Sequence, residues 1–515
     1  MKNSKAGKVY LIGAGPGDPG LITVRGRDLL YSCQAVVYDN LVSEELIIHI
    51  SPEVESYYVG KRAGHHIMEQ EKINDLLLKL AREGKNVARL KGSDPLIFGR
   101  GGEEAAYLRE NGIEFEIVPG VTAGIAAPAY AGIPCTDRER SSFVLFVTGH
   151  KATDKSHSSV PWKWVGQGYK GTVVIYMGVQ ELPRIVKKLI DGGYRPETPA
   201  AAIERGTYPT QKTVIATLAT LPDEVIKQDI KPPTIFIIGE VVNLKDKLSW
   251  IERRPLTGLR VMVTRAADQA DPTYKQLREL GAEPLPYPTI ATGEIIDEKG
   301  WDALKRCTGD NNWLAFTSAN GVRYFFDQLC GRGADPRHLG KFKIAAVGHG
   351  TNSALSAQGL ATDFIPEDAT VLTLAEAMLE KFNLKGANII RVRGTLADDR
   401  FEKAVTSAGA DCHQLTTYRT FHPVWPDGFK EKLLEHLPDA IMFTSRSSVD
   451  GLAKNLSGEE IKKILSHARI FSLGTGITTL IEEKGFTVTA QTGTHSIEGL
   501  VETIYCHFTD LKHRH

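Results

Sequence analysis

Three glycine-rich turns restrict most strongly how this chain can fold, because each directly follows a short apolar run. They are Leu11–Thr23 (LIGAGPGDPGLIT), Arg89–Glu104 (RLKGSDPLIFGRGGEE) and Val118–Gly124 (VPGVTAG). In an open α/β sheet, the loops that follow parallel strands meet at the carboxyl edge, where such sheets bind ligands. We therefore expect the three loops to converge on one pocket.

The segments between these turns alternate between strand and helix patterns. Apolar runs typical of buried strands occur at 8–12, 35–38, 54–59 and 86–90, and helical spacing occurs at 23–32 and 68–83. Such alternation predicts an α/β domain with a largely parallel sheet. Pro134 marks the end of this first lobe, and a second lobe is expected from strands at 143–147, 172–177, 200–203 and 234–238.

The first turn does not match the nucleotide-binding loops that it superficially suggests. The dinucleotide pattern GxGxxG requires glycine where this chain has Asp18, and a carboxylate there would repel a pyrophosphate. A P-loop is excluded because no Gly-Lys-Ser/Thr follows any of the turns. An NAD-dependent enzyme is therefore a disfavoured alternative.

Composition narrows the class of protein further. The 515 residues suggest roughly three compact units at ~150 residues each. The 62 Lys+Arg balance 62 Asp+Glu, so no basic excess indicates nucleic acid as a partner. No apolar stretch approaches the ~18 residues of a membrane span, and no signal sequence is present, so we expect a soluble cytoplasmic protein without a membrane partner.

Metal binding is not indicated either. The six cysteines include no CxxC pair, so neither a zinc site nor a disulfide framework is expected. The adjacent His65 and His66 lack a third ligand at helical spacing and are expected to lie in a solvated loop.

Further motifs accompany the glycine turns in a fixed order: Val37-Tyr-Asp-Asn-Leu-Val42, Gly60-Lys-Arg-Ala-Gly64, Tyr176-Met-Gly178 and Ile238-Gly-Glu-Val-Val242. Residues 8–242 thereby resemble the uroporphyrinogen-III C-methyltransferase family, methylases that use S-adenosylmethionine on tetrapyrroles. The resemblance implies a two-lobed fold, S-adenosyl-L-methionine as cofactor, a tetrapyrrole substrate and a homodimer formed through the methyltransferase domain.

The family motifs also imply the residues of the cofactor site. By position they are Pro16, Gly92, Asp94, Ile97, Thr122, Ala123, Met177 and Gly206. Glycine and small residues suit a zwitterionic cofactor, because they let backbone donors and acceptors approach it closely. Ser93 replaces the second glycine usual in the family, which leaves the conformation of that loop open.

The tetrapyrrole carries many carboxylates, for which Arg100 and Arg138 are the candidate ligands. Methyl transfer requires alignment of the reactants and removal of a pyrrole N–H proton. Asp39, at a strand end, is one candidate base, and its alternative role is the N-cap of a helix at 41–50. Arg100 and Glu103 form a competing constellation that orients the ring or relays the proton; their alternative is a surface ion pair.

A charged segment at 243–258 separates the chain into two parts. It ends in Pro255 and Gly258 and precedes a new strand at 259–263. We predict a methyltransferase domain at 1–245, a linker at 246–257 and a second domain at 258–515, each half with its own core.

The second half repeats itself loosely. Val261–Arg265 recurs as Ile389–Arg393, Phe316-Thr-Ser318 as Phe443-Thr-Ser445, and Val347-Gly348 as Leu473-Gly474, in one order and at nearly one spacing. The repetition predicts two similar α/β lobes with a ligand site between them.

This half resembles uroporphyrinogen-III synthase through Phe316–Val322, Ala346–Thr351, Tyr418-Arg-Thr420 and Ser496–Leu500. Its position behind a tetrapyrrole methylase supports the resemblance, because the synthase makes the substrate of the methylase. The family fold implies discontinuous lobes, one from 258–292 with 421–515 and the other from 293–420. The implied reaction closes hydroxymethylbilane with inversion of ring D and loss of water.

Tyr418 matches the family's candidate acid, and its alternative role is packing at a strand. The residues expected to hold substrate carboxylates are Thr317, Ser318, Thr444, Ser445, Gly474 and Thr475. The Thr-Ser pairs also suit N-caps or turns, which is compatible with binding. Where the family usually has threonine after the second-lobe glycine, this chain has Ile477, and Thr475 or Thr478 is the candidate replacement.

The favoured function is therefore a bifunctional enzyme that makes uroporphyrinogen III and methylates it to precorrin-2. The alternative is a methyltransferase fused to a non-catalytic tetrapyrrole-binding or sensory module, which Tyr418 and the intact methylase motifs disfavour. No segment is expected to supply the dehydrogenase/chelatase domain of the three-function siroheme enzymes.

Overall fold

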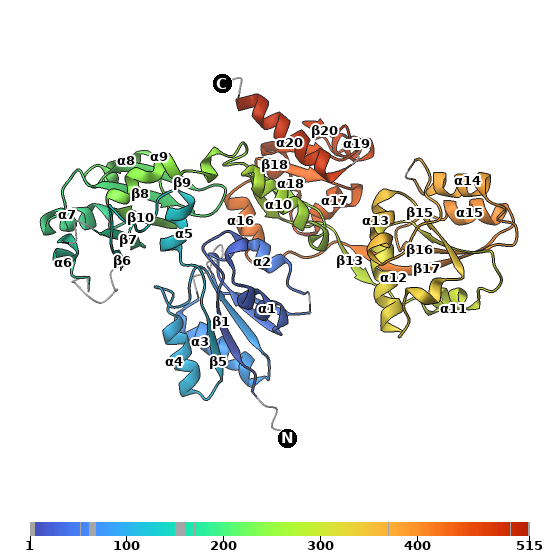
Figure 1. Ribbon diagram of the computed structural model, residues 1–515, viewed down its shortest axis with the longest axis horizontal. Helices are drawn as coiled ribbons and strands as arrows, with labels where there is room; N and C mark the ends of the chain where they lie inside the picture. The colour runs from blue at the N-terminus through green and yellow to red at the C-terminus, as the bar shows by residue number, and fades with distance from the viewer. Residues whose placement is uncertain are drawn as a thin grey trace. The chain divides into compact units, whose positions relative to one another are not determined.

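The computed structural model describes residues 6–51, 53–60, 68–149, 160–167, 171–368, 370–494 and 496–512 (Figure 1). The pair His65-His66 and all of the Gly60–Gly64 motif except Gly60 lie outside the described residues. Two compact units are present, one comprising residues 1–289 and 424–515, the other residues 290–423. Within the described residues, every helix is too short or too polar to cross a bilayer.

The first sheet of the larger unit carries the glycine turns. Its strand order is β3 (Glu55–Tyr58), β2 (Ala35–Tyr38), β4 (Val87–Lys91), β1 (Val9–Gly13), β5 (Phe115–Val118). All pairs are parallel, as predicted. The intervening helices are α1 (Val24–Ser32), α2 (Glu44–Ile48), α3 (Gln70–Arg82), α4 (Gly101–Glu110) and α5 (Ala123–Tyr130).

The second sheet is mixed rather than parallel. Its order is β6 (Val144–Thr148), β7 (Thr172–Tyr176), β10 (Thr234–Ile238), β8 (Pro199–Glu204), β9 (Lys212–Thr217). Strand β10 runs antiparallel to β7 and β8, and the edge strand β9, which the sequence reading missed, is antiparallel to β8. Helices α6 (Trp162–Gly166), α7 (Leu182–Gly192) and α8 (Leu221–Lys227) belong to this lobe.

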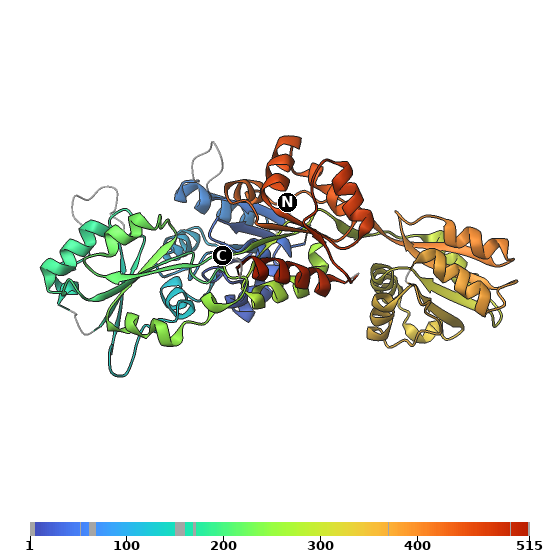
Figure 2. The ribbon, with the colours of Figure 1, turned by 90° about the horizontal axis from the view of Figure 1, so that it is seen from above.

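The third sheet brings together residues that are far apart in sequence. Its order is β12 (Glu283–Pro286), β11 (Arg260–Val263), β18 (Ala440–Phe443), β19 (Arg469–Ser472), β20 (Ala490–Gln491). Its helices are α10 (Asp271–Leu280), α16 (Phe429–Glu435), α17 (Arg446–Asp450), α18 (Gly458–His467), α19 (Thr475–Glu483) and α20 (Ile497–Lys512). Helices α10 and α20 lie side by side (Figure 2) because Leu277 packs in one apolar cluster with Leu500 and Ile504. The predicted discontinuous lobe is therefore confirmed.

The smaller unit is a second α/β lobe of the same kind. Its sheet has the order β13 (Ala291–Glu294), β17 (Asp411–Phe421), β16 (Asn388–Gly394), β14 (Asn312–Phe316), β15 (Phe342–Ala346). All pairs are parallel except β13 with β17. Its helices are α11 (Glu298–Arg306), α12 (Ala319–Gly331), α13 (His349–Ala357), α14 (Val371–Lys381) and α15 (Arg400–Ser407). The α/β fold class is confirmed throughout.

The charged segment at 243–258 packs onto its neighbours in its second part. It forms α9 (Lys245–Leu248) and a 3₁₀ turn at Ile251–Arg253, and both Ile251 and Leu256 are buried. The Trp250 ring lies edge-on to Tyr130 with the centroids 5.1 Å apart. Of its charged residues, Asp246 and Lys247 are exposed, whereas Lys245 and Glu252 form a partly buried ion pair at 2.7 Å.

Each half has apolar clusters of its own, and the larger unit adds one cluster that both halves share. One apolar cluster contains Tyr38 and Leu46 from the first sheet's side and Leu285 and Phe429 from the third sheet's side. Polar contacts join the same surfaces: the Tyr38 hydroxyl donates to the Asp427 carbonyl at 3.1 Å. The sequence did not reveal this packing because apolar residues of both parts fit the core of their own lobe equally well.

Candidate active sites

The three glycine loops converge at the carboxyl edge of the first sheet. Ser93 N–H donates to the Gly15 carbonyl at 2.7 Å, and Gly120 N–H donates to Asp94 Oδ2 at 3.0 Å. The backbones approach so closely that a Cβ on Gly13 would lie 2.6 Å from the Gly120 Cα. Glycine is therefore required where the loops touch.

Ser93, the departure from the family pattern, adopts a left-handed backbone with φ 69°. Such a backbone costs a non-glycine residue roughly 1–2 kcal/mol. The side chain offsets part of this cost, because Ser93 Oγ accepts a hydrogen bond from Ala123 N–H at 2.7 Å and lies 3.3 Å from Thr122 Oγ1. Serine thus ties the second loop to the third, a link that glycine cannot make.

Tyr176 contacts the glycine loops, although the sequence motif Tyr176-Met-Gly178 predicted only Met177 as a residue of the cofactor site. Its buried hydroxyl lies 2.7 Å from Thr122 Oγ1 and accepts from Gly124 N–H at 2.8 Å. Burial raises the pKa of this phenol, so Tyr176 stays a neutral hydrogen-bonding group. Met177 follows at φ 53° and is 52% exposed, which places its side chain outside the apolar core. Tyr176 therefore joins the second lobe to the glycine loops.

The remaining expected cofactor residues lie at or near these loops. Gly92 directly follows β4, and a Cβ there would be 2.6 Å from the Leu41 Cβ. Gly206 packs equally tightly on α5, since its Cβ would be 2.2 Å from the Ala127 Cβ. Pro16 lies in the first loop, and Ile97 is exposed in the second.

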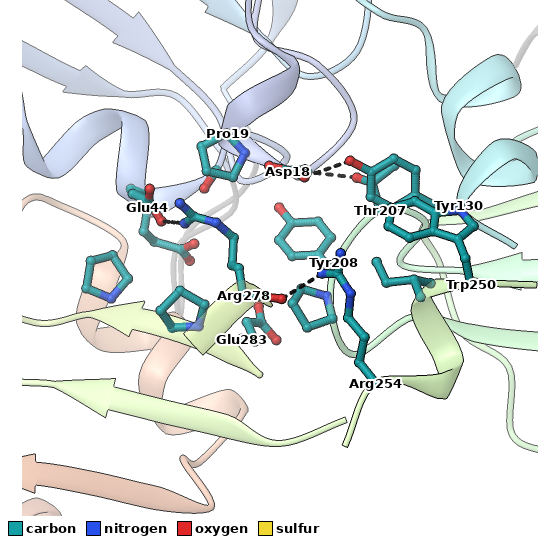
Figure 3. A pocket seen from close by; sticks show the side chains of 17 residues that line it. Asp18, Pro19, Glu44, Tyr130, Thr207, Tyr208, Trp250, Arg254, Arg278 and Glu283 are labelled. Atoms are coloured by element: carbon teal, nitrogen blue, oxygen red, sulfur yellow. Dashed lines mark hydrogen bonds and ion pairs between the residues drawn. The ribbon is translucent and has the colours of Figure 1, made fainter. Parts of the chain in front are cut away.

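Asp18, whose carboxylate is unsuited to a dinucleotide loop, forms hydrogen bonds within the protein (Figure 3). Its Oδ2 accepts from the Tyr130 hydroxyl at 2.7 Å, its Oδ1 accepts from Gly20 N–H at 2.8 Å, and its own N–H donates to Thr207 Oγ1 at 3.0 Å. These contacts fix the first loop against residues of the second lobe. Asp18 also borders a cavity of about 230 Å³ that is lined on another side by Arg278 and Glu283.

Asp39 follows β2 and is partly exposed, with a side-chain accessibility of 24%. Its Oδ1 accepts from Leu41 N–H at 3.0 Å, and its Oδ2 lies 3.5 Å from Arg89 Nη2. Ser43, not Asp39, is the N-cap residue of α2. The alternative that Asp39 caps this helix is therefore wrong.

Arg89 belongs to a buried ionic cluster that the sequence reading missed. Glu104 of α4 is fully buried, and its Oε1 accepts from Arg89 Nε at 3.3 Å, Lys91 Nζ at 2.8 Å and Gln70 Nε2 at 3.0 Å. Glu104 Oε2 has no hydrogen-bond partner among the described residues. Burial, reinforced by Arg89, lowers the pKa of Lys91. The signal was the alternation Arg89-Leu-Lys91 at the end of an otherwise apolar strand.

Arg100 and Glu103 form an exposed bidentate ion pair, with N–O distances of 3.0 and 2.7 Å. The bonded guanidinium lowers the pKa of Glu103. Arg100 itself has a left-handed backbone at φ 59° just before α4. Arg138 is exposed in the turn between Asp137 and Ser141.

In the smaller unit, Tyr418 lies on β17 with its hydroxyl 2.9 Å from Ser318 Oγ. Its ring stacks on Tyr324 at 5.6 Å between centroids. Strand β17 carries a β-bulge at Thr417, opposite Arg393 and Gly394 of the neighbouring strand β16, and a Cβ at Gly394 would come within 2.6 Å of the Tyr418 ring. The bulge and the glycine therefore set the position of this hydroxyl.

The two Thr-Ser pairs occupy equivalent places in the two lobes. Ser318 accepts from Gly321 N–H as the N-cap of α12, and Ser445 accepts from Ser448 N–H as the N-cap of α17. The N-cap reading of these serines is thus confirmed. The Thr317 hydroxyl donates to the Val392 carbonyl at 3.1 Å, and Thr444 is half-buried at the end of β18.

The candidate threonines after Gly474 differ in availability. Thr478 Oγ1 is engaged with Ser472 Oγ at 2.7 Å and Gln491 Oε1 at 2.9 Å. Thr475 is exposed at the first position of α19, directly after Gly474, while Ile477 is buried. Thr475 is therefore the better candidate ligand.

Comparison with known proteins follows the same division of the chain. A family model for tetrapyrrole (corrin/porphyrin) methylases matches residues 8–222, and one for uroporphyrinogen-III synthase HemD matches residues 271–502. The porphyrin biosynthesis protein HemD of Ruminiclostridium josui is 39% identical over 452 residues, covering 87% of this chain and 89% of that protein.

Two methyltransferases are also similar to the chain. A uroporphyrinogen-III C-methyltransferase of Bacillus subtilis (strain 168) is 38% identical over 370 residues, 72% of this chain and 74% of that protein. An S-adenosyl-L-methionine-dependent uroporphyrinogen III methyltransferase of Methanosarcina barkeri (strain Fusaro / DSM 804) is 47% identical over 242 residues, 47% of this chain and 94% of that protein. The chain belongs to the family of proteins that join a tetrapyrrole methylase to uroporphyrinogen-III synthase HemD.

Proposed function

We propose that this chain is a bifunctional enzyme of tetrapyrrole biosynthesis. Its synthase part cyclises hydroxymethylbilane to uroporphyrinogen III with inversion of ring D, and its methylase part converts that product to precorrin-2 with two methyl groups from S-adenosyl-L-methionine. The observation that carries the proposal is the match of both families to one chain, across 87% of which a single relative aligns.

The converging glycine loops fit S-adenosyl-L-methionine by their chemistry. Beyond Lys91, which belongs to strand β4, the three loops contain no lysine of the kind that binds a phosphate. They do contain the carboxylates of Asp18 and Asp94, which suit a ligand with a cationic centre. Residues Pro16, Gly92, Asp94, Ile97, Thr122, Ala123, Met177 and Gly206 form the cofactor site. The cofactor supplies an electrophilic methyl group on a sulfonium.

The chain's own task in methylation is to hold the tetrapyrrole and remove a pyrrole proton. Asp39 is the general base, because it is a partly exposed carboxylate at the same sheet edge and Arg89 lies beside its Oδ2. Arg100 and Arg138 bind substrate carboxylates, and Glu103 orients the Arg100 fork. A role for Arg100 and Glu103 in proton relay is the competing assignment.

In the synthase part, Tyr418 donates the proton that helps the hydroxyl leave as water. Its hydrogen bond to Ser318 and its stacking on Tyr324 hold the phenol in place. Substrate carboxylates are bound by Thr317 and Ser318 in the smaller unit and by Thr444, Ser445, Gly474 and Thr475 in the larger one. N-capping uses each serine oxygen as an acceptor, so the hydroxyl hydrogen can still be donated to a carboxylate.

The proposed bifunctional enzyme also implies the partners, the cellular location and the oligomeric state of the chain. Its partners are small tetrapyrroles, it acts in the cytoplasm, and it forms a homodimer through the methyltransferase domain. Sedimentation of the intact chain measures the dimer directly.

The deciding experiment incubates the purified chain with hydroxymethylbilane and S-adenosyl-L-methionine and follows precorrin-2 by absorbance and chromatography. We expect uroporphyrinogen III without the cofactor and precorrin-2 with it. Tight binding of hydroxymethylbilane without its conversion, beside intact methylation of supplied uroporphyrinogen III, would instead identify the second half as a binding module.

A further inference from the structure

A cavity of about 490 Å³ lies beside Tyr418 within the smaller unit. Tyr418 and Thr420 line one side of it from the same face of β17, two residues apart. The loop after β16 lines another side, including Gly394, against which the Tyr418 ring rests. A ligand in this cavity would therefore touch the proposed acid.

The amino ends of two helices border the cavity. Thr370, which lines it, is the N-cap of α14 and accepts from Thr373 N–H at 3.1 Å. Asp398 and Arg400, which also line it, stand at the start of α15. Helix amino ends carry partial positive charge and favour anions. Helix α14 has 11 residues and helix α15 has 8, so each is at least two turns long and directs the positive end of its dipole toward the cavity.

Two arginines add full charges to this setting. Arg391 lines the cavity at 1% exposure; its Nη1 donates to the Asp398 carbonyl at 2.7 Å, and its Nε has no partner among the described residues. Arg400 is exposed and donates to Asp398 Oδ2 through Nε at 2.8 Å and Nη2 at 2.7 Å. Glu402, which is not among the described residues that line the cavity, accepts from Arg391 Nη1, so the exposed Arg400 is the cation of the wall that a ligand can reach.

We propose that this cavity binds one carboxylate side chain of the linear tetrapyrrole, with the Arg400 guanidinium and the Thr420 hydroxyl as its ligands. The inference rests on the proposed synthase function and names a binding site for the same reaction. Arg400 exchanges part of its contact with Asp398 for the substrate carboxylate, and the anchored side chain places the adjoining ring beside Tyr418. Arg391, which is paired with Glu402, contributes by holding the Asp398 carbonyl in the wall of the cavity.

The two partners of one ion pair provide the test, because they should act in opposite directions. Arg400→Gln removes the ligand, and we expect the KM for hydroxymethylbilane to rise about 10- to 100-fold, the range for a charge-assisted hydrogen bond, with kcat changed much less. Asp398→Asn keeps the acceptor for Arg400 N–H but removes the competing charge, so the KM should stay equal or fall. Thr420→Val should raise the KM several-fold.

Asp335 and Arg337 form a matched control pair elsewhere in the smaller unit. Arg337 N–H and Nε donate to Asp335 Oδ1 at 2.9 and 3.0 Å, the same spacing in sequence as Asp398 and Arg400, and neither lines the cavity. Arg337→Gln and Asp335→Asn should leave synthase kinetics unchanged. Thermal unfolding of every variant checks that the lobe remains folded.

A rise in KM of similar size for both Arg400→Gln and Asp398→Asn would reduce this pair to a loop brace and overturn the inference. An unchanged KM in Arg400→Gln and Thr420→Val, in a chain whose wild type cyclises the substrate, would also overturn it while leaving the proposed function intact. Failure of the wild type to cyclise hydroxymethylbilane would contradict both. Should Arg400→Gln fail to fold, Thr420→Val and Asp398→Asn still decide.

Discussion

Two strands of this molecule, β4 in the methylase part and β16 in the synthase part, solve one electrostatic problem in different ways. Each ends in two cationic side chains that alternate with an apolar residue, Arg89 and Lys91 in β4, Arg391 and Arg393 in β16. In each case a buried glutamate from the first turn of the following helix accepts from both cations.

The two clusters differ in their second cation, which is a lysine in the methylase part and an arginine in the synthase part. Burial lowers the pKa of Lys91, which makes its charge easier to remove than that of an arginine, a side chain that stays charged at every physiological pH. In the synthase cluster, Arg393 Nη1 also donates to Asp399 Oδ1 at 2.7 Å, just as Arg89 of the methylase cluster has Asp39 as a second carboxylate partner. Each cluster leaves one buried polar atom without a partner among the described residues, Glu104 Oε2 in the methylase part and Arg391 Nε in the synthase part. The two clusters therefore differ in the kind of cation, not in how completely the cations are paired.

The largest effect should follow from Glu402→Gln. It leaves Arg391 buried without a carboxylate, and breaking a buried pair by removing one partner costs about 3–5 kcal/mol. We expect a marked fall in the Tm of the transition that includes residues 290–423, and its size should not depend on pH between 7 and 9. A loss that shrinks as pH rises would show that the arginine pair is not permanently charged.

Glu104→Gln should cost less, on the order of 1–3 kcal/mol for a buried hydrogen-bonded group at neutral pH, because Lys91 can deprotonate and Arg89 keeps Asp39 nearby. Glu104 raises the pKa of Lys91 against the lowering by burial, so Glu104→Gln moves this folded-state pKa further below its unfolded value, and the stability of the variant rises with pH more than that of wild type. The deficit in Tm relative to wild type should therefore shrink from pH 7 to pH 9. The exposed neighbour gives the control: Glu103→Gln should change Tm by little.

Arg89→Lys should have the smallest effect and act on rate rather than stability. Lysine keeps a charge for Glu104 but lacks the second nitrogen that lies 3.5 Å from Asp39. We expect the kcat of methylation to fall a few-fold without a matching loss of cofactor affinity, measured by initial rates and calorimetric titration. In an Asp39→Asn background the same substitution should lose its effect on kcat; an equal further loss there would mean that Arg89 does not act through Asp39.

Sequence reasoning reached the parts of the molecule that depend on local backbone chemistry. Gly13, Gly15 and Gly120 mark loops whose convergence follows from the order of parallel strands, and Ser318 and Ser445 are caps recognisable from their sequence context. Tyr418 was reached through a family motif. Its exact surroundings depend on a bulge opposite Gly394, which no sequence pattern revealed.

What escaped prediction depends on partners distant in sequence. Arg89 and Lys91 look like the polar side of an alternating strand until Glu104 is known to cover them. The segment at 243–258 looks like a solvated connection, because its buried side chains, Ile251 and Leu256, are few among many charges. The shared apolar cluster of the larger unit likewise arises from surfaces that each satisfy an ordinary lobe pattern.

One comparison of two single variants tests the central claim that this chain holds two separate catalytic sites. In the intact protein, supplied with hydroxymethylbilane and S-adenosyl-L-methionine, Asp39→Asn should accumulate uroporphyrinogen III and make precorrin-2 about 100-fold more slowly, the scale of a lost general base. Tyr418→Phe should slow cyclisation yet methylate supplied uroporphyrinogen III at the wild-type rate. Loss of both activities in either folded variant would contradict the account.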